Sequence, residues 1–352
     1  MTTHTHTHTH TPSSLQSPTL TRERNVVNSS HPSEYLDNMM RLFYSLTSPR
    51  VVSLIITTLT CLLLVMLASP ASTELLELSY TYNIDAPTSP KLKPFTSTIL
   101  NKGLNQLGFW VELNEFCTSE HSGTHVDAPV HFSKDSWTLD AIPLDRLWRV
   151  PGVVIDVSEA IRVSGERNYG IKAKDLEAWE EDHGTIPDGV VVLIRTGWGK
   201  KSQNLGQYSG LDLKKRNNFP GLSEEAATWL ATHGSRHGHS RGVMGVGVDT
   251  ISVDVGNSTH YLAHRAMYSR NVYGMENLAN LDKLPTSGFL LTILPMKIGG
   301  GSGGPARIIA EVPVGVPSFI ADTAGSSCLS SCLSLPFVLL LARMMMSGLQ
   351  RL

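Results

Sequence analysis

The chain has 352 residues, of which 41% are hydrophobic and 17% charged, and its formal net charge is -2. This much apolar material is enough for a sizeable core and excludes a chain that is disordered throughout. A nearly neutral chain without a basic stripe lacks the charge pattern of a nucleic-acid-binding protein, so we expect a small-molecule partner and no nucleic acid.

The N-terminal part differs in composition from the rest. Residues 1–50 open with alternating Thr and His and continue rich in Ser, Thr and Pro, which predicts a disordered segment. Residues 51–72 begin with an uncharged apolar run over 51–68 that follows Arg50. This pattern predicts a signal peptide or signal anchor, and membrane attachment through residues 51–68. The folded part would then be secreted or membrane-anchored on the lumenal or extracellular side; the alternative is a cytoplasmic protein with a mispredicted start.

The two segments that follow are a folded domain over residues 75–317 and a tail over residues 318–352. The tail is rich in Ser and Cys and ends in an apolar run, a pattern that resembles a lipid-anchor signal, although Arg343 interrupts the run. The middle segment alternates short β-branched runs with stretches that have helical spacing, which predicts an α/β domain. The expected strands cover residues 152–156, 190–195 and 243–249, and the expected helices cover 174–181 and 223–231.

The strongest local signal is the segment HSGTHVDAPVHF, which begins at His121. Its Gly, Pro and β-branched residues disfavour a helix, so we expect a strand or extended loop with alternate side chains on one face. His125, Asp127 and His131 then point the same way as His121. Imidazole and carboxylate groups that converge in this way suit Zn²⁺, Mn²⁺ or Fe²⁺ and predict a metal site.

Other histidines and loops are weaker signals. His260 and His264 precede Glu276, but spacing alone does not tie these residues to the same site. The stretch 233–242 carries three histidines among Gly, Ser and Arg, which favours an exposed loop over a metal site. The glycine-rich stretch 299–304 lacks the Lys-Ser/Thr of a phosphate loop and predicts a place where backbone approaches closely.

Several further stretches occur in the order of one known family. They are IPLDRL with GVVIDVS, IPDGVVVLIRTGWG, FPGLSEEAATWL, GVGVDTISVD, AHR with ENLANLDKLP, and LPMKIGGGSGGPARIIA. With HSGTHVDAPVHF, they resemble the cyclase family of metal-dependent hydrolases, of the kynurenine formamidase and isatin hydrolase type. The resemblance implies a single mixed-sheet α/β domain, swivelling β/β/α-like, with the sheet curled around the site and helices outside, and a homo-oligomer.

The resemblance also implies roles for individual residues. His121, His125 and Asp127 look like ligands of a first metal, and Asp127 would bridge to a second one. His264 and Glu276 look like the ligands of that second metal, and His260 fits the family pattern less well. His131 looks like the catalytic acid/base. The expected cofactor is a divalent metal, Zn²⁺ or Mn²⁺, at one or two ions per subunit.

The implied function is hydrolysis of a small aromatic formamide, as by an arylformamidase in tryptophan catabolism. One alternative is ring opening of a cyclic amide, as by isatin hydrolase, and another is a non-catalytic binding domain on the same fold. The region 85–94 lacks the Trp that bacterial formamidases often place near the start of the domain to contact substrate. Phe109, Trp110 and Phe116 are candidates for a pocket that holds a flat substrate, or for core. Asn257 begins a glycosylation pattern a few residues before His264, which conflicts with secretion unless its loop turns outward.

Overall fold

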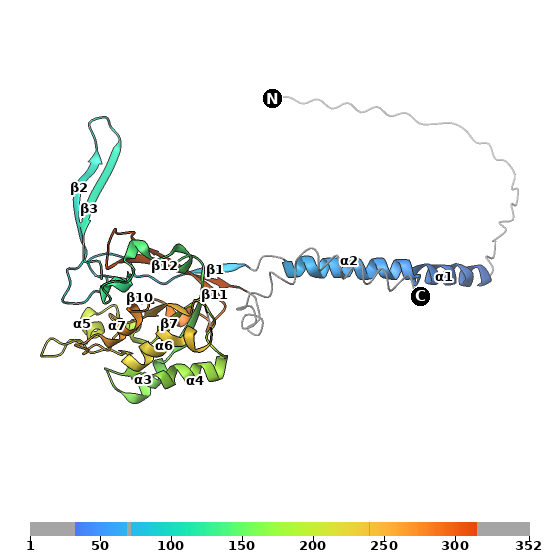
Figure 1. The fold of residues 1–352 in the computed structure, drawn as a ribbon. Coiled ribbons are helices and arrows are strands. Elements are labelled where there is room, and N and C mark those ends of the chain that lie inside the picture. Colours follow the sequence, from blue (N-terminus) through green and yellow to red (C-terminus); the bar gives the residue numbers. More distant parts are fainter. Residues whose placement is uncertain (1–31, 69–71, 239, 315–352) are drawn as a thin grey trace, which may run out of the picture. The chain divides into compact units, whose positions relative to one another are not determined.

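The structure is a computed structural model that describes residues 32–68, 72–238 and 240–314 (Figure 1). It divides into two compact units, Met1–Pro70 and Ala71–Leu352. The predicted folded domain, residues 75–317, falls within the second unit. The predicted tail, residues 318–352, lies outside the described residues, so the lipid-anchor signal stays a prediction.

The first unit contains two helices, α1 (Pro32–Leu46) and α2 (Pro49–Ala68). Helix α1 differs from the disorder predicted for residues 1–50, because its apolar residues recur at helical spacing and form one face. The run 51–68 lies within α2. Among the described residues, no single helix is long and apolar enough to cross a membrane. The helix pair Leu36–Leu46 and Pro49–Thr60, bent by 50°, meets the length and composition criterion only when its two parts are taken together. The secretory route and its cytoplasmic alternative both stay predictions.

The second unit is built on a mixed eight-stranded sheet in the order β1-β12-β11-β5-β7-β9-β10-β4. Strands β5, β7, β9 and β10 run parallel, and the other pairings are antiparallel. Because β4 also pairs with β12, the sheet closes into a barrel, which confirms the predicted fold class. The strand bounds are β1 Thr73–Glu77, β4 His125–Asp127, β5 Val150–Asp156, β7 Val190–Arg195, β9 Val243–Val248, β10 Tyr273–Glu276, β11 Phe289–Pro295 and β12 Gly303–Pro313.

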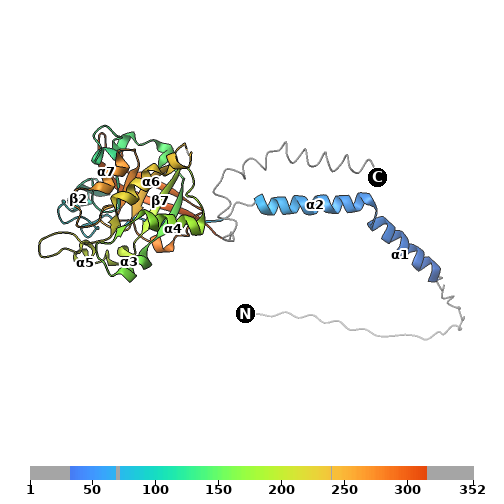
Figure 2. The same cartoon turned by 60° about the horizontal axis from the view of Figure 1, so that its bottom comes forward.

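Helices cover the outside of the parallel strands. Figure 2 shows α4 and α6, which contact each other, beside β7. Side chains of β7 alternate between two cores: Val192 packs toward the helices, and Val191 packs into the barrel. The helix bounds are α3 Ser158–Ser164, α4 Ala173–His183, α5 Leu205–Ser209, α6 Glu224–Arg236 and α7 Leu262–Tyr268. Short pieces are the strands β6 Gly170–Ile171 and β8 Gly221–Leu222 and the 3₁₀ turns Pro129–His131, Leu139–Ala141, Leu144–Arg146, Trp198–Lys201 and Leu281–Lys283.

The strands and helices predicted from periodicity are confirmed. The three predicted strands correspond to β5, β7 and β9, and the two predicted helices to α4 and α6. Helix α6 begins where the sequence indicated, because the Ser223 hydroxyl accepts a hydrogen bond from the Ala226 N–H at 3.1 Å.

A separate hairpin, β2 (Thr96–Leu104) and β3 (Trp110–Cys117), stands away from the barrel (Figure 1). We call it the β2–β3 hairpin. Its large apolar side chains are exposed, so the suggestion that Phe109, Trp110 and Phe116 line a pocket or belong to a core is wrong. The exposed set on the two strands and their turn is Ile99, Leu100, Leu104, Leu107, Phe109, Trp110, Leu113 and Phe116.

Candidate metal centre

The HSGTHVDAPVHF segment is held in place by a very short strand. Of the predicted extended stretch, only β4 is a strand; residues Pro129–His131 form a 3₁₀ turn. Within β4 the alternation holds, because Val126 faces the barrel core while its neighbours face the site. The turn before β4 needs glycine: Gly123 has φ +65°, and a Cβ there would lie 2.5 Å from the Tyr82 ring.

The pairing of β4 brings distant residues to the segment. Opposite His125 lie Glu276 on β10 and Pro305 on β12. Gly303 on β12 lies opposite Asp127, and a Cβ on it would sit 2.6 Å from His121 Cε1. The prediction of close backbone approach in the glycine-rich stretch is thus confirmed at this point. The neighbouring strand β10 therefore supplies Glu276 to the site.

Asp127 is the centre of the cluster. Its carboxylate Oδ1 lies 2.7 Å from His121 Nδ1 and 3.1 Å from His125 Nε2. Its Oδ2 lies 3.3 Å from His264 Nε2 and accepts a hydrogen bond from the Tyr268 hydroxyl at 2.7 Å. Burial opposes ionisation, but the neighbouring imidazoles outweigh it and hold the pKa of Asp127 well below its usual value. Asp127 is therefore an anion with one oxygen on each side of the cluster.

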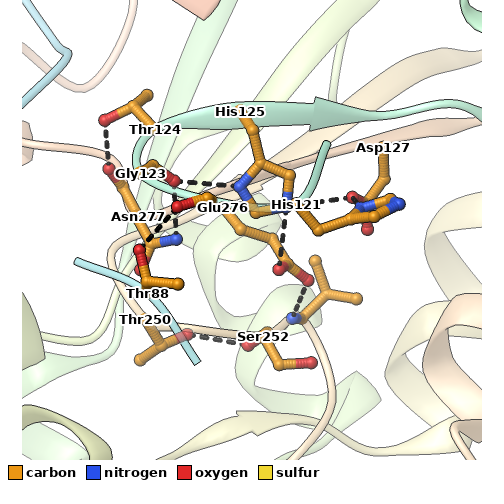
Figure 3. A network of polar contacts seen from close by, with 12 residues as sticks. Thr88, His121, Gly123, Thr124, His125, Asp127, Thr250, Ser252, Glu276 and Asn277 are labelled. Atoms are coloured by element: carbon orange, nitrogen blue, oxygen red, sulfur yellow. Dashed lines mark hydrogen bonds and ion pairs between the residues drawn. The ribbon is translucent and has the colours of Figure 1, made fainter. Parts of the chain in front are cut away.

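Glu276 closes the cluster opposite Asp127 (Figure 3). Its Oε1 lies 3.2 Å from His264 Nε2, and its Oε2 lies 3.4 Å from His125 Nε2. The Val253 N–H donates to Oε1 at 3.0 Å and fixes the carboxylate. The structure thus brings together all five residues predicted as ligands: His121, His125, Asp127, His264 and Glu276. Their role as metal ligands stays a prediction.

The donor atoms of His125 fit a cation. Its Nδ1 donates to the Gly123 carbonyl at 2.9 Å, and Asn277 Nδ2 donates to the same oxygen at 2.8 Å. In the neutral ring this fixes the tautomer, with the lone pair on Nε2 pointing at the two carboxylates. Nε2 is buried and has no hydrogen-bond partner among the described residues. Burial lowers the pKa of His125, but the nearby carboxylates of Asp127 and Glu276 outweigh burial and raise the pKa to about 10. The two carboxylates therefore stabilise a positive charge at His125 Nε2, which a proton or a metal ion can supply.

His131 lies beside the cluster but has a different environment. Its ring stacks on His121 with centroids 3.9 Å apart and lies 4.5 Å from the Phe132 ring. Burial is the main cause that lowers the pKa of His131 to about 4, and the neighbouring imidazoles add to it. His131 is thus neutral at pH 7. Ligand atoms of Asp127, His131 and His264 also lie within 4.8 Å of one another, so geometry alone leaves a ligand role open for His131.

Two residues that hold the cluster were missed by the sequence analysis. Asp254 Oδ2 lies 2.5 Å from His264 Nδ1 and accepts from the His264 N–H at 3.1 Å, which orients the ring so that Nε2 faces the site. Tyr268 donates to Asp127 from the same helix, α7. Asp254 is the last residue of the GVGVDTISVD stretch, which contributed to the family resemblance but to which the sequence analysis assigned no function. His260, predicted to fit less well, is exposed, and its ring contacts Thr259.

A cavity of about 290 Å³ opens onto the cluster. His121, His131, His264 and Glu276 form one part of its wall. The remainder is mixed, with apolar and aromatic side chains beside hydroxyls and one lysine; it comprises Ser89, Lys91, Leu92, Phe132, Asn217, Phe219, Ile251, Ser252, Val255, Gly256, Ser258 and Tyr261. Asn257 is exposed between two of these lining residues, so a glycan on it would stand at the cavity. A larger cavity, about 460 Å³, lies beside Tyr80 and Asp249 and shares none of these residues.

Comparison with known proteins identifies the family. The profile of a family described as a putative cyclase matches residues 76–255, about half of the chain. Isatin hydrolase of Roseibium aggregatum is 33% identical over 209 residues, which are 57% of this chain and 74% of that protein. The chain belongs to the cyclase family. The resemblance inferred from the motifs is therefore confirmed.

Other members of the cyclase family extend the match. Kynurenine formamidase of Bacillus cereus is 25% identical over 240 residues, which are 68% of this chain and 97% of that protein. Isatin hydrolase A from Ralstonia solanacearum superposes with a TM-score of 0.60 at 30% identity, over 76% of this chain and 98% of that one. Isatin hydrolase A from Labrenzia aggregata superposes with a TM-score of 0.61 at 29% identity, over 72% of this chain and 99% of that one. The two solved isatin hydrolase structures share the fold of this chain.

Proposed function

We propose that this cyclase-family protein is a metal-dependent hydrolase of small aromatic formamides or cyclic amides. The observation that carries the proposal is the buried cluster around Asp127, in which the His125 Nε2 lone pair faces two carboxylates beside a cavity. A buried arrangement of this kind is costly without a cation. The names of the relatives, isatin hydrolase and kynurenine formamidase, supply the class of bond.

The proposed ligands divide into two groups around shared carboxylates. His121 and His125 lie near Asp127 Oδ1, while His264 lies near Asp127 Oδ2 and Glu276 Oε1. This division allows one ion or two per subunit, and the mixed nitrogen and oxygen donors suit Zn²⁺ or Mn²⁺. When bound, such an ion supplies Lewis acidity and brings the pKa of water toward about 7.

The protein's own residues then serve the proton transfers. Hydrolysis adds water to the carbonyl carbon and breaks the C–N bond, and a proton must reach the leaving nitrogen. His131 lines the cavity as a neutral imidazole, so it takes a proton from the attacking water and passes it to that nitrogen. Phe132, Phe219 and Tyr261 offer apolar surface to a flat ring in the same cavity.

The two substrate classes are supported unequally. Ring opening of a cyclic amide is favoured by the 33% identity to isatin hydrolase, against 25% to kynurenine formamidase. The lack of Trp in residues 85–94 points the same way, since substrate-contacting Trp was expected there for a formamidase. The competing proposal of another class is a non-catalytic binding domain. The complete set of five predicted ligands and His131 speaks against it, because a binding domain has no need of them.

An activity screen tests the proposed function. The purified full chain, supplied with Zn²⁺ or Mn²⁺, is assayed with isatin, N-formylkynurenine and simple cyclic amides. We expect turnover of at least one aromatic substrate and its loss after chelation. Protein that binds no metal, or activity unchanged in Asp127→Ala and His131→Ala, would overturn the proposed site. Metal-loaded protein that turns over none of these substrates would favour a binding domain.

We also propose that the chain forms a homo-oligomer through the β2–β3 hairpin. An isolated two-stranded hairpin is at best marginally stable in water, and this one exposes a continuous set of large apolar side chains. Lys102 pairs with Glu112 across the hairpin at 3.0 Å, and Glu115 is also exposed on β3, so the surface carries charge of both signs. A second copy related by a two-fold axis would meet both apolar surface and opposite charge.

A further inference from the structure

A second group of metal-ligating side chains lies on the outer helices, away from the catalytic cluster. Its members are Glu180 on α4, His233 near the end of α6, and His237, which ends that helix. The sequence favoured an exposed loop for residues 233–242. This interpretation is wrong for His233, which is fully buried, because α6 extends five residues beyond the predicted end of the helix.

The group is held by contacts on both helices. His233 Nε2 lies 2.8 Å from Glu180 Oε1, and the Ile186 N–H donates to the same oxygen at 2.7 Å. His237 follows His233 by four residues, and their ring centroids are 4.4 Å apart. One ligand atom from each of Glu180, His233 and His237 lies within 4.8 Å of the other two. Two imidazoles and one carboxylate thus converge at the point where α4 and α6 meet.

We propose that Glu180, His233 and His237 form a second metal site, which binds a divalent transition metal such as Zn²⁺. Two histidines four residues apart on a helix present both imidazoles to one ion, and a carboxylate completes a three-ligand set. Tetrahedral Zn²⁺ places its ligand atoms about 3.3 Å apart. The three atoms already lie within 4.8 Å of one another, so small side-chain rotations bring them into range.

The burial of the three residues fits such a site. His233 is buried, Glu180 is half-buried and His237 is exposed. An ion therefore reaches the site from solvent on the His237 side and is held by the other two residues. Glu180 Oε1 is fixed by the Ile186 N–H, which leaves the carboxylate oriented before metal binds. Bound metal would link α4 to the C-terminal end of α6, where the loop to β9 begins.

The experiment counts bound zinc in variants of the full chain. Histidine-rich tracts can bind metal, so His4, His6, His8 and His10 are changed to Asn in every protein used. The key variant is His237→Ala, since His237 is exposed and its loss leaves the Glu180–His233 bond intact. The matched control is His260→Ala, another exposed histidine. Each protein is saturated with Zn²⁺, passed over a desalting column and analysed for zinc per chain.

We expect His237→Ala to lose one zinc per chain relative to the parent and to His260→Ala. The same loss is expected when His237→Ala is added to Asp127→Ala, a variant that has already lost zinc from the catalytic cluster. This comparison distinguishes zinc bound at the two sites. Zinc-edge anomalous diffraction of the parent is expected to show a peak between Glu180, His233 and His237. Equal zinc content in the parent and His237→Ala, or no such peak, would overturn the proposal and leave a structural hydrogen bond between the helices.

Discussion

The β2–β3 hairpin and strand β4 are neighbours in the sequence, yet they reverse the usual distribution of polar and apolar residues. In the hairpin, Leu104 is 72% exposed and Trp110 is 59% exposed. Only eight residues after the hairpin ends, His125 and Asp127 are each 1% exposed. Hydrophobic residues normally lie inside and charged residues outside. We propose a partner that compensates for each reversal: a cation for the cluster and a second copy of the chain for the hairpin.

The largest effect is expected from Asp127→Asn, which keeps the shape of the side chain and removes the central negative charge. We expect kcat/KM to fall by more than about 10³-fold, because metal-ion stabilisation is worth several kcal/mol. Bound metal should fall with it, as measured by elemental analysis. Asp135→Asn, at an exposed site, is the control. Full metal content and activity in Asp127→Asn would mean that the buried cluster is structural.

The next largest effect is expected from His131→Gln. We expect kcat to fall by about 10²–10⁴-fold, the usual contribution of a general acid/base, while bound metal stays at the wild-type level. His260→Gln, an exposed histidine, is the matched control and should change neither quantity. If His131→Gln loses metal, then His131 is a ligand together with Asp127 and His264, and its assignment as the acid/base is wrong.

A smaller effect is expected from Asp254→Asn, which weakens the 2.5 Å contact that orients His264. Changes of this kind behind a ligand typically cost about 10–100-fold in metal affinity or activity. We expect a rise in the metal concentration needed for half-maximal activity, with recovery at high metal. A lower unfolding temperature without any change in metal dependence would show that Asp254 supports only the fold.

The smallest effect on catalysis is expected from Leu113→Glu in the hairpin, which should change the oligomeric state instead. Each large apolar side chain buried between copies contributes about 1.5–3 kcal/mol, so one charged substitution should shift the oligomer toward monomer. Light scattering coupled to size exclusion measures the mass, and Leu213→Glu, at an exposed leucine outside the two strands, is the matched control. A wild-type chain that is already monomeric would contradict the proposed interface.

The sequence predicted those parts of the molecule that depend on local patterns. β5, β7, β9, α4 and α6 follow from periodicity, and the convergence of His125 and Asp127 follows from alternation along β4. The link from these residues to His264 and Glu276 came only from the family resemblance, because it depends on the pairing of β4 with β10. Asp254 and Tyr268 were missed because their contacts with His264 and Asp127 depend on where helix α7 packs. The hairpin was misread because apolar residues were assumed to be covered by their own chain.

Strand β4 is only three residues long, but it is paired on both sides, to β10 and to β12. A slip of one residue would turn Val126 toward the site and the His125 and Asp127 side chains into the core, so the register cannot drift. A closed barrel also leaves β4 no edge from which to fray. We therefore expect its amide hydrogens to exchange with solvent only when the whole barrel unfolds. The arrangement of the centre is then built into folding itself, before any metal arrives.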